Sequence, residues 1–460
     1  MSEVSRIFMF GFDTPVLGGE HLEFFRRINA RNFILFKKNL ARLEENIKII
    51  KNEFRNPIIA IDQEGGIVRR LKETESFMFG NMNAAMSDNE KYVEKLFAKT
   101  GQILREKGFN LNLAPVIDVY LKAGNHIGIR SFGSNEKRVA ALSVSAIKGL
   151  HEAGVMTTVK HFIGYGGALK DPHKGLPVFI SGEDGLRKAL YPFEKTAKHT
   201  DFIMSAHIIV EELDREMPVT FSKNALTFLR VKSGFRGPII SDCLEMGGAA
   251  IFPPGETALN ALRAGNDMLI VSHTLSVQKE MFKAVEKKGG KDTERAVMRI
   301  ESLKKRRFAE SKTETLEKYV TVVKNSGFIP QNDFHFLHPN VTEEVQVEEM
   351  GKIVGNFPLD TDSSDIEKFA SFENEYAVME VYNAFRHKGQ IALAKKIKQN
   401  GKKLCVIVAG DPADIPLFRF ADCVIATLSP LSGIMEYALK AVEGKEKLGG
   451  ILPVSEEIWK

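Results

Sequence analysis

Short runs of apolar residues recur along roughly the first 275 residues, and amphipathic stretches separate them. Most runs are too short for helices and are rich in Val, Ile and Phe, which is typical of strands buried on both faces of a parallel sheet. The runs are Ile7–Phe12, Phe33–Phe36, Ile58–Ile61, Leu111–Val119, Met156–His161, Phe202–Ala206, Pro238–Ser241 and Met268–Val271. Helical periodicity covers His21–Asn29, Asn89–Lys107, Lys137–Ala153 and Ala258–Ala264. This alternation predicts an α/β fold, a (β/α)8 barrel of the TIM type.

A second α/β segment follows the predicted barrel. Apolar runs predict strands at Tyr376–Val381, Leu404–Ala409 and Cys423–Thr427, with helices at Ile391–Gln399 and Ile434–Glu443. A chain of 460 residues is long enough for two hydrophobic cores. We therefore predict a catalytic barrel over residues 1–310, a linker over 311–340 and a smaller, sandwich-like α/β domain over 341–460.

Composition narrows the class of protein. The chain is 43% hydrophobic and 27% charged, and its net charge of +5 is spread along the sequence rather than gathered in a basic stripe. This distribution argues against a nucleic-acid partner. No apolar stretch approaches the roughly 20 residues of a membrane helix, so no membrane partner is expected. The three cysteines, Cys243, Cys405 and Cys423, match no zinc-site spacing. With an N-terminus that lacks an export signal, they predict a cytoplasmic protein.

Polar residues stand at or just after the ends of several predicted strands. In a (β/α)8 barrel the carboxyl ends of the strands carry the chemistry, so these residues are candidates for one site. They are Asp62, Asp118, Lys160, His161, His207 and Asp242.

Two aspartates have both a chemical and a structural interpretation. Asp62 opens the sequence Asp-Gln-Glu-Gly-Gly, where it could accept hydrogen bonds from sugar hydroxyls or cap a helix. Asp242 follows the apolar run Pro238–Ile240 and is well placed to attack an anomeric carbon. Alternatively it is a buried aspartate that caps the next helix, and in either case burial requires a partner.

A glycine-rich stretch after the fifth strand ends in Asp171-Pro172-His173. In an extended segment the side chains of Asp171 and His173 point the same way. The carboxylate could then orient the imidazole and raise its basicity, which suits a proton carrier.

The remaining candidates are cations and a histidine. Lys160 needs an anionic or hydroxyl partner if it is buried. Arg70 and Arg130 could bind a carboxylate or carbonyl of a substrate, or form ordinary surface ion pairs. His207 could line a pocket or be a core histidine satisfied by the backbone.

Six stretches together resemble the family 3 glycoside hydrolases, in particular their β-N-acetylglucosaminidase branch, and they occur in the order of that family. The stretches are Ile61-Asp-Gln-Glu-Gly-Gly-Ile-Val-Arg-Arg-Leu, Leu113-Ala-Pro-Val-Ile-Asp-Val, Arg130-Ser-Phe-Gly, Lys160-His-Phe, Asp171-Pro-His and Ser241-Asp-Cys-Leu-Glu-Met. The tail Gly449-Gly-Ile-Leu-Pro-Val resembles the end of the second domain in that family.

The resemblance implies a retaining mechanism with a covalent glycosyl-enzyme intermediate. Asp242 falls on the nucleophile, and Asp171 with His173 falls on the dyad whose histidine protonates the leaving oxygen and then activates the acceptor. Positions that bind the hydroxyls and the N-acetyl group correspond to Asp62, Arg130, Lys160, His161 and His207, with Arg70 as a companion. The expected substrate is a small oligosaccharide derived from chitin or cell wall. No metal or organic cofactor is expected, and a homodimer stays open.

Three alternatives remain at this point. A histidine donor is neutral once it has given up its proton and then does not repel an anionic acceptor as a carboxylate would, so a phosphorylase could use the same scaffold. A β-glucosidase of this family draws a glutamate from the second domain instead. A sugar-binding module would require a broken nucleophile or dyad, and neither is broken. Departures from the family pattern occur at Ile67, Ile163, Tyr165, Ala168 and Pro172, and they leave substrate preference and loop motion open.

Overall fold

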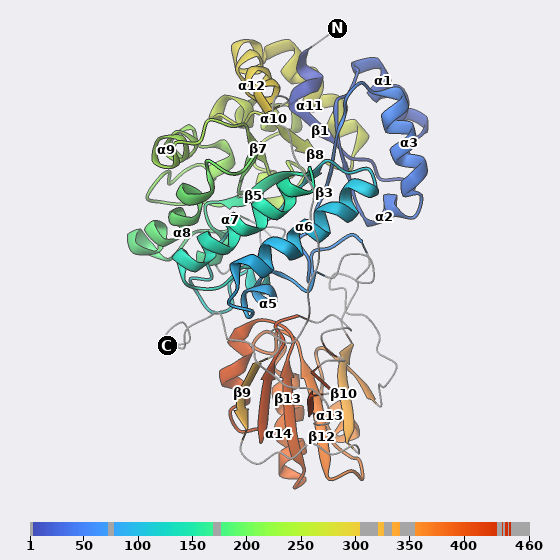
Figure 1. The fold of residues 1–460 in the computed structure, drawn as a ribbon, viewed down its shortest axis with the longest axis vertical. Helices are drawn as coiled ribbons and strands as arrows, with labels where there is room; N and C mark the ends of the chain where they lie inside the picture. The colour runs from blue at the N-terminus through green and yellow to red at the C-terminus, as the bar shows by residue number, and fades with distance from the viewer. Residues whose placement is uncertain are drawn as a thin grey trace.

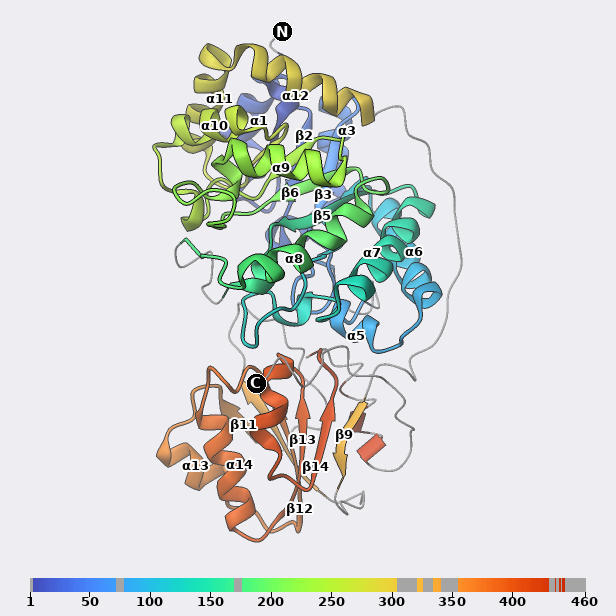
Figure 2. The same cartoon turned by 90° about the vertical axis from the view of Figure 1, so that its left-hand side faces the viewer.

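The computed structural model describes residues 3–71, 78–168, 176–303, 321–325, 334–340 and 355–429, with residues 435, 438, 439, 441 and 442. Each of two parts is built around its own sheet, and Figures 1 and 2 show the second part below the first. Among the residues described, no helix is both long enough and apolar enough to cross a bilayer.

The first part is a parallel barrel. Its sheet runs in the order β7-β6-β5-β4-β3-β2-β1-β8, and every pair of neighbours is parallel. A parallel bridge between Ile240 and Met268 brings the two outer strands together and completes the circuit. The strands are β1 (Phe8–Phe10), β2 (Asn32–Leu35), β3 (Ile58–Ile61), β4 (Leu111–Asn112), β5 (Met156–Phe162), β6 (Phe202–Ser205), β7 (Ile239–Ser241) and β8 (Leu269–Val271). The predicted TIM-type barrel is confirmed.

Each predicted apolar run in this part overlaps one strand, because these residues are buried on both sides of the sheet. The run Leu111–Val119 forms a strand only over its first two residues. Pro115 has no N–H to donate, which ends the regular pairing. The chain nevertheless stays beside β5, since Ile117 N donates to Lys160 O at 2.8 Å.

Helices form the outer layer of the barrel (Figure 1). They are α1 (Gly19–Ile28), α2 (Lys37–Leu40), α3 (Leu43–Glu53), α5 (Asn81–Ala85), α6 (Glu90–Glu106), α7 (Glu136–Glu152), α8 (Gly182–Thr196), α9 (Lys223–Ser233), α10 (Pro254–Ala264), α11 (Leu275–Lys288) and α12 (Gly290–Leu303). Side chains that accept hydrogen bonds from the first turn set where two long helices begin: Asn89 caps α6 and Asn135 caps α7. The apolar faces of α6 and α7 pack against each other, and α7 also packs against β5.

The second part holds a six-stranded sheet in the order β11-β10-β12-β13-β14-β9. Only β9 is antiparallel to its neighbour. The strands are β9 (Thr321–Asn325), β10 (His335–Asn340), β11 (Gly355–Pro358), β12 (Tyr376–Val381), β13 (Lys403–Val408) and β14 (Cys423–Ala426), and the helices are α13 (Ser363–Phe369) and α14 (Gly389–Gln399). The predicted strands correspond to β12, β13 and β14, and Ile391–Gln399 lies within α14. Most of the predicted helix Ile434–Glu443, and the tail from Gly449, lie outside the described residues.

Two strands of the second sheet fall within the range predicted as a linker. β9 and β10 lie between residues 311 and 340, so this sheet begins earlier in the sequence than residue 341. Their sequences are Thr321-Val-Val-Lys-Asn and His335-Phe-Leu-His-Pro-Asn. Polar residues at both ends of each strand leave only two adjacent apolar residues, so neither strand forms an apolar run in the sequence. The rest of the domain division stays a prediction.

The two parts share a buried apolar contact. Met82, Met86, Tyr120 and Ile129 of the barrel belong to the same buried cluster as the core residues of the second sheet. This cluster joins α5 and the loops after β4 to the second sheet, in agreement with the proximity of α5 to that part in Figure 2.

Hydrogen bonds reinforce this contact. Asn83 Nδ2 donates to Thr427 O at 2.9 Å, and Arg386 Nη2 donates to Gly124 O at 3.1 Å. The hydroxyl of Tyr120 donates to Asp411, which stands at the start of the 3-10 turn η6 (Pro412–Phe418). Three loops at the carboxyl ends of β12, β13 and β14 therefore meet the barrel.

Candidate active site

The barrel brings the predicted site residues to one rim. Asp62 directly follows β3, Lys160 and His161 are near the end of β5, and His207 and Asp242 follow β6 and β7. Because all these strands are parallel, their carboxyl ends lie on the same side of the barrel. Residues that are 180 positions apart in sequence therefore face a common space.

Lys160 is the centre of a buried charge network. Its side chain is 3% exposed, and its Nζ lies 2.8 Å from Asp62 Oδ1 and 2.6 Å from Glu64 Oε1. Burial lowers the pKa of Lys160, but the two carboxylates raise it more, so its pKa ends above the ordinary value. Lys160 is thus held as a cation between two anions.

Glu64 and Arg130 form the second ion pair of this network. Nε and Nη2 of Arg130 each donate to a separate Glu64 oxygen at 2.8 Å, the two-pronged geometry that guanidinium groups favour. Burial acts to raise the pKa of Glu64, but Arg130 and Lys160 together bring it well below the ordinary value. The ion pair of Arg130 is thus buried rather than at the surface. Glu64 already accepts hydrogen bonds from the Nε and Nη2 of Arg130 that a substrate carboxylate would otherwise use.

His161 is fixed from both sides. Its backbone N and its Nδ1 both lie 2.9 Å from Asp118 Oδ2, and its Nε2 lies 3.2 Å from Arg130 Nη2. A carboxylate accepts and a guanidinium donates, so the proton sits on Nδ1 and Nε2 accepts. This geometry sets the orientation and the tautomer of the ring.

Asp242 is half-buried at the end of β7. Its backbone N donates to Ser205 O at 3.1 Å, and its Oδ1 accepts a hydrogen bond from Cys243 N at 2.8 Å. Burial raises the pKa of this carboxyl, but His207, the Cys243 N–H and Lys160 lower it more. The net pKa lies below the ordinary value, so Asp242 is ionised at neutral pH.

His207 is already bonded within the protein through both ring nitrogens. Nδ1 lies 2.9 Å from Thr220 Oγ1, and Nε2 lies 2.9 Å from Cys243 O. Since a carbonyl oxygen only accepts, Nε2 carries a proton and donates it there. These are the bonds expected of a core histidine, and a role for His207 in lining the sugar site stays a prediction.

The other predicted residues divide into two groups. Arg70 joins the network, with Nη2 3.6 Å from Asp62 Oδ2 and its guanidinium 5.7 Å from the centre of the Phe36 ring. The dyad, Asp171 and His173, lies outside the described residues, as does Pro172.

Glu64 and Tyr165, which sequence reasoning did not select, also contribute to this rim, together with the strand-end candidate Asp118. Glu64 binds Lys160 and Arg130, Asp118 orients His161, and the hydroxyl of Tyr165 accepts a hydrogen bond from His207 N at 3.0 Å. Asp118 had the strand-end signal, and Glu64 stands in the same motif as Asp62. Tyr165 was visible only as a departure from the family pattern.

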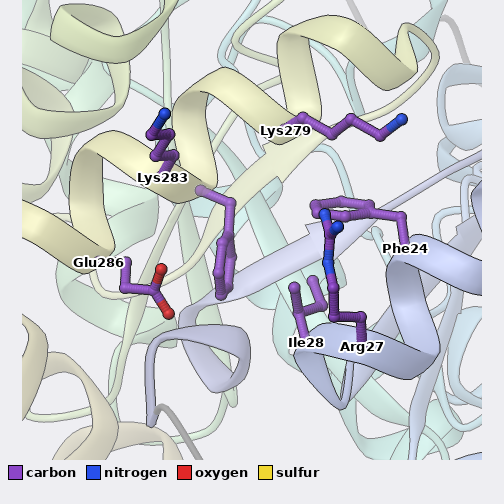
Figure 3. A pocket seen from close by; sticks show the side chains of 7 residues that line it. Phe24, Arg27, Ile28, Lys279, Lys283 and Glu286 are labelled. Carbon is purple, nitrogen blue, oxygen red and sulfur yellow. The ribbon is translucent and has the colours of Figure 1, made fainter.

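Elsewhere, a surface pocket of about 410 Å³ lies between α1 and α11 in the outer helical layer (Figure 3). None of the predicted site residues lines it. Its lining residues are Phe24, Arg27, Ile28, Lys279, Phe282, Lys283 and Glu286.

Within the described part of the chain, no group of His, Cys, Asp and Glu side chains has the arrangement of a metal site. The described side chains of the rim include carboxylates, cations and histidines.

Comparison with known proteins identifies the family. The sequence profile of the glycosyl hydrolase family 3 N terminal domain matches residues 28–303, which is more than half of the chain. The chain belongs to glycosyl hydrolase family 3. It is therefore a glycoside hydrolase, and the match runs from the end of α1 to the end of α12.

Relatives within the family agree with this assignment. A β-hexosaminidase of Pseudomonas aeruginosa is 32% identical over 265 residues, which span 55% of this chain and 79% of that protein. A β-hexosaminidase of Tolumonas auensis is 36% identical over 267 residues, again 55% of this chain and 79% of that protein. Each alignment spans a little over half of this chain.

A solved structure extends the likeness to both domains. The family 3 β-N-acetylglucosaminidase of Paenibacillus sp. strain FPU-7 matches with a TM-score of 0.89 at 25% identity, over 98% of each chain. The arrangement of barrel and second sheet is therefore also found in that enzyme.

Proposed function

We propose that this protein is a retaining exo-β-N-acetylglucosaminidase that releases terminal β-linked N-acetylglucosamine from small oligosaccharides. The observation that carries the proposal is the Asp242 carboxylate, which is ionised and half-buried at the end of β7. The names of the similar hexosaminidases and the match to the Paenibacillus enzyme support the choice of sugar.

A retaining glycosidase needs one ionised nucleophile and one proton donor. Asp242 supplies the nucleophile in this proposal. Asp171 and His173, predicted from the sequence, supply the proton to the leaving oxygen and later activate water. The glycosyl ester on Asp242 is then hydrolysed with overall retention of configuration.

The charge network is proposed to bind the sugar. The carboxyl oxygens of Asp62 can accept hydrogen bonds from sugar hydroxyls, and Lys160 and His161 lie next to it at the rim. Arg130 and Arg70 frame this region through Glu64 and Asp62. Because each of these side chains is held by ionic partners, the site is rigid before substrate arrives, which favours tight orientation.

A substrate panel tests the proposal. Wild-type protein is expected to cleave an aryl β-N-acetylglucosaminide faster than the matching aryl β-glucoside, and Asp242→Ala is expected to reduce kcat by about 10⁴-fold or more. Asp184→Ala, on the exposed start of α8, is the matched control and should keep the wild-type rate. Failure of both wild type and Asp242→Ala to turn over any of these substrates would refute the proposal.

The same panel decides the acceptor. With water as acceptor, added inorganic phosphate leaves the rate unchanged and free N-acetylglucosamine is the product. A phosphate-dependent rate with release of the sugar 1-phosphate would instead identify a phosphorylase. The histidine donor of the predicted dyad, neutral once it has given up its proton, is compatible with both, so the product must be identified directly.

We further propose that the natural substrates are chito-oligosaccharides or cell-wall fragments and that the enzyme acts in the cytoplasm. The first part rests on the exo-specificity above, and the second on the small number of cysteines. Comparing release of N-acetylglucosamine from chitobiose and from a disaccharide of N-acetylglucosamine and N-acetylmuramic acid separates the two sources. Fractionation of the host cell tests the location.

A further inference from the structure

Tyr165 lies at the start of the loop that follows β5. It is the first residue of the 3-10 turn η3 (Tyr165–Gly167), three residues after β5, and only 1% of its surface is exposed. Its ring centre lies 5.0 Å from that of His161. The ring therefore packs inside the rim rather than on the outside of the barrel.

The hydroxyl of Tyr165 begins a continuous line of hydrogen bonds. It accepts from His207 N at 3.0 Å, His207 Nε2 donates to Cys243 O at 2.9 Å, and Cys243 N donates to Asp242 Oδ1 at 2.8 Å. The line crosses from the end of β5 to the end of β6 and then to the end of β7. Successive links share a residue, first His207 and then Cys243, but they use different atoms of that residue.

We propose that Tyr165 is a positioning residue for the nucleophile: its hydroxyl holds His207, and through His207 and Cys243 it fixes the carboxylate of Asp242. The inference rests on the proposed function, because it concerns the geometry of the attacking group. It goes beyond that function in assigning a role to a residue at which this chain departs from the family pattern.

The electrostatics of Tyr165 agree with this geometry. Burial raises the pKa of its hydroxyl well above the ordinary value, and the nearby Asp242 carboxylate raises it further. The hydroxyl is therefore neutral at all working pH values. It keeps its proton, and its lone pairs remain available to the N–H of His207.

Tyr165→Phe tests the proposal because it keeps the ring and removes only the hydroxyl. We expect kcat on the aryl β-N-acetylglucosaminide to fall about 10- to 100-fold, with KM changed by less than about threefold. A role limited to packing would leave kcat within about twofold of wild type, and this result would overturn the proposal. An increase in KM with kcat unchanged would overturn it too, since it would make Tyr165 a binding residue.

The pH profile gives a readout that packing alone would not move. His207, His161 and Lys160 act on the ionisation of Asp242, together with the Cys243 N–H. Tyr165 also faces this carboxylate, whose charge raises the pKa of the Tyr165 hydroxyl. Loosening the Cys243 N–H bond weakens an interaction that favours the ionised carboxylate. The acidic limb of kcat/KM is therefore expected at higher pH in Tyr165→Phe than in wild type, and an unmoved limb would contradict the proposal.

Two further variants make the experiment decisive. Tyr382→Phe removes the hydroxyl of another buried tyrosine, at the end of β12, and should leave kcat and the pH profile unchanged. If Tyr165→Phe does not fold, Tyr165→His is used, since an imidazole nitrogen can also accept from His207 N. Its kcat should lie within about tenfold of wild type, and a loss beyond about 100-fold in a folded protein would overturn the proposal. Should Asp242→Ala be inactive while Tyr165→Phe is fully active, the proposed function stands and this inference alone fails.

Discussion

At the residue scale, Glu64 shows how burial changes the effect of an ion pair on the stability of the fold. Its side chain is 2% exposed and pairs with both Arg130 and Lys160, whereas Glu53 pairs with Arg26 at the protein surface. A solvent-exposed ion pair adds little to the stability of the fold, because solvent screens the charges and the side chains lose conformational freedom. In the interior, removing one partner leaves a charge without compensation, which is far more costly.

Replacement of Glu64 by Gln should therefore destabilise the barrel strongly. The change removes the one carboxylate that contacts both Lys160 and Arg130, and we expect the free energy of unfolding to fall by about 3–5 kcal/mol. Urea denaturation of the full chain measures it. Glu53→Gln is the matched control and should leave the transition where it is in wild type. A loss below about 1 kcal/mol for Glu64→Gln would show that the network does not stabilise the fold.

The sequence predicted individual residues unevenly, and the reasons are physical. Asp62, Lys160, His161 and Asp242 could be predicted because they end apolar runs, and parallel strands bring such ends together. Glu64 could not be separated from Asp62 by position, because the sequence does not say which carboxylate meets which cation. The two ring nitrogens of His207 bond to Thr220 Oγ1 and to Cys243 O. Both partners are distant in the sequence, so the local sequence around His207 does not predict them.

At the scale of elements, the barrel strands were predictable and the loops were not. The eight barrel strands are buried on both faces, so each leaves an apolar run in the sequence. The loops that shape the rim are held by main-chain contacts instead. Leu121 N and Lys122 N, in the loop after β4, donate to Gly166 O at 3.1 and 3.2 Å. These bonds join the loop to η3, and the pattern of side chains along the sequence does not predict them.

Gly166 is required by this contact between two loops. A Cβ at this position would lie 1.8 Å from Val119 O, which is far inside any real contact distance. Gly166→Ala should therefore push the loops after β4 and β5 apart, with a drop in melting temperature and a loss of kcat/KM of at least about tenfold. Gly18→Ala is the control, because a Cβ there meets nothing within 4 Å. Wild-type activity in Gly166→Ala would show that this loop packing does not shape the site.

At the scale of the whole molecule, the second domain is tied to the barrel through a buried carboxyl. Asp411 accepts from the Tyr120 hydroxyl and from Ala413 N, the latter at 2.8 Å. Burial raises the pKa of Asp411 to about 6, although these hydrogen bonds oppose the rise. The sequence could place Asp411 after a strand, but not at the barrel, because the contact depends on how two domains pack.

The raised pKa of Asp411 predicts how this contact depends on pH. A carboxyl whose folded-state pKa lies above its unfolded value contributes stability below the unfolded pKa of about 4, and that contribution is lost as pH rises through about 6. A pKa difference of about two corresponds to on the order of 3 kcal/mol. The stability of wild type relative to Asp411→Asn should therefore fall by up to that amount between pH 4 and pH 7.

Denaturation of both proteins across this pH range measures the difference. Asp362→Asn is the control, because hydrogen bonds from Asp365 N and Ser364 hold the pKa of the exposed Asp362 below its ordinary value. Its contribution has the opposite sign and is lost as pH falls. A flat difference between wild type and Asp411→Asn would mean that Asp411 does not titrate at the domain contact.

The most direct test of the account is to trap the covalent intermediate. An activated 5-fluoro analogue of N-acetylglucosamine is expected to react with the wild-type enzyme, because fluorine slows the second step more than the first. Peptide mass spectrometry should then place a single sugar on the peptide that contains Asp242, and Asp242→Asn should remain unlabelled. A sugar on another carboxylate, such as Asp62 or Glu245, or turnover by Asp242→Asn at the wild-type rate, would contradict the assignment of Asp242 as the nucleophile.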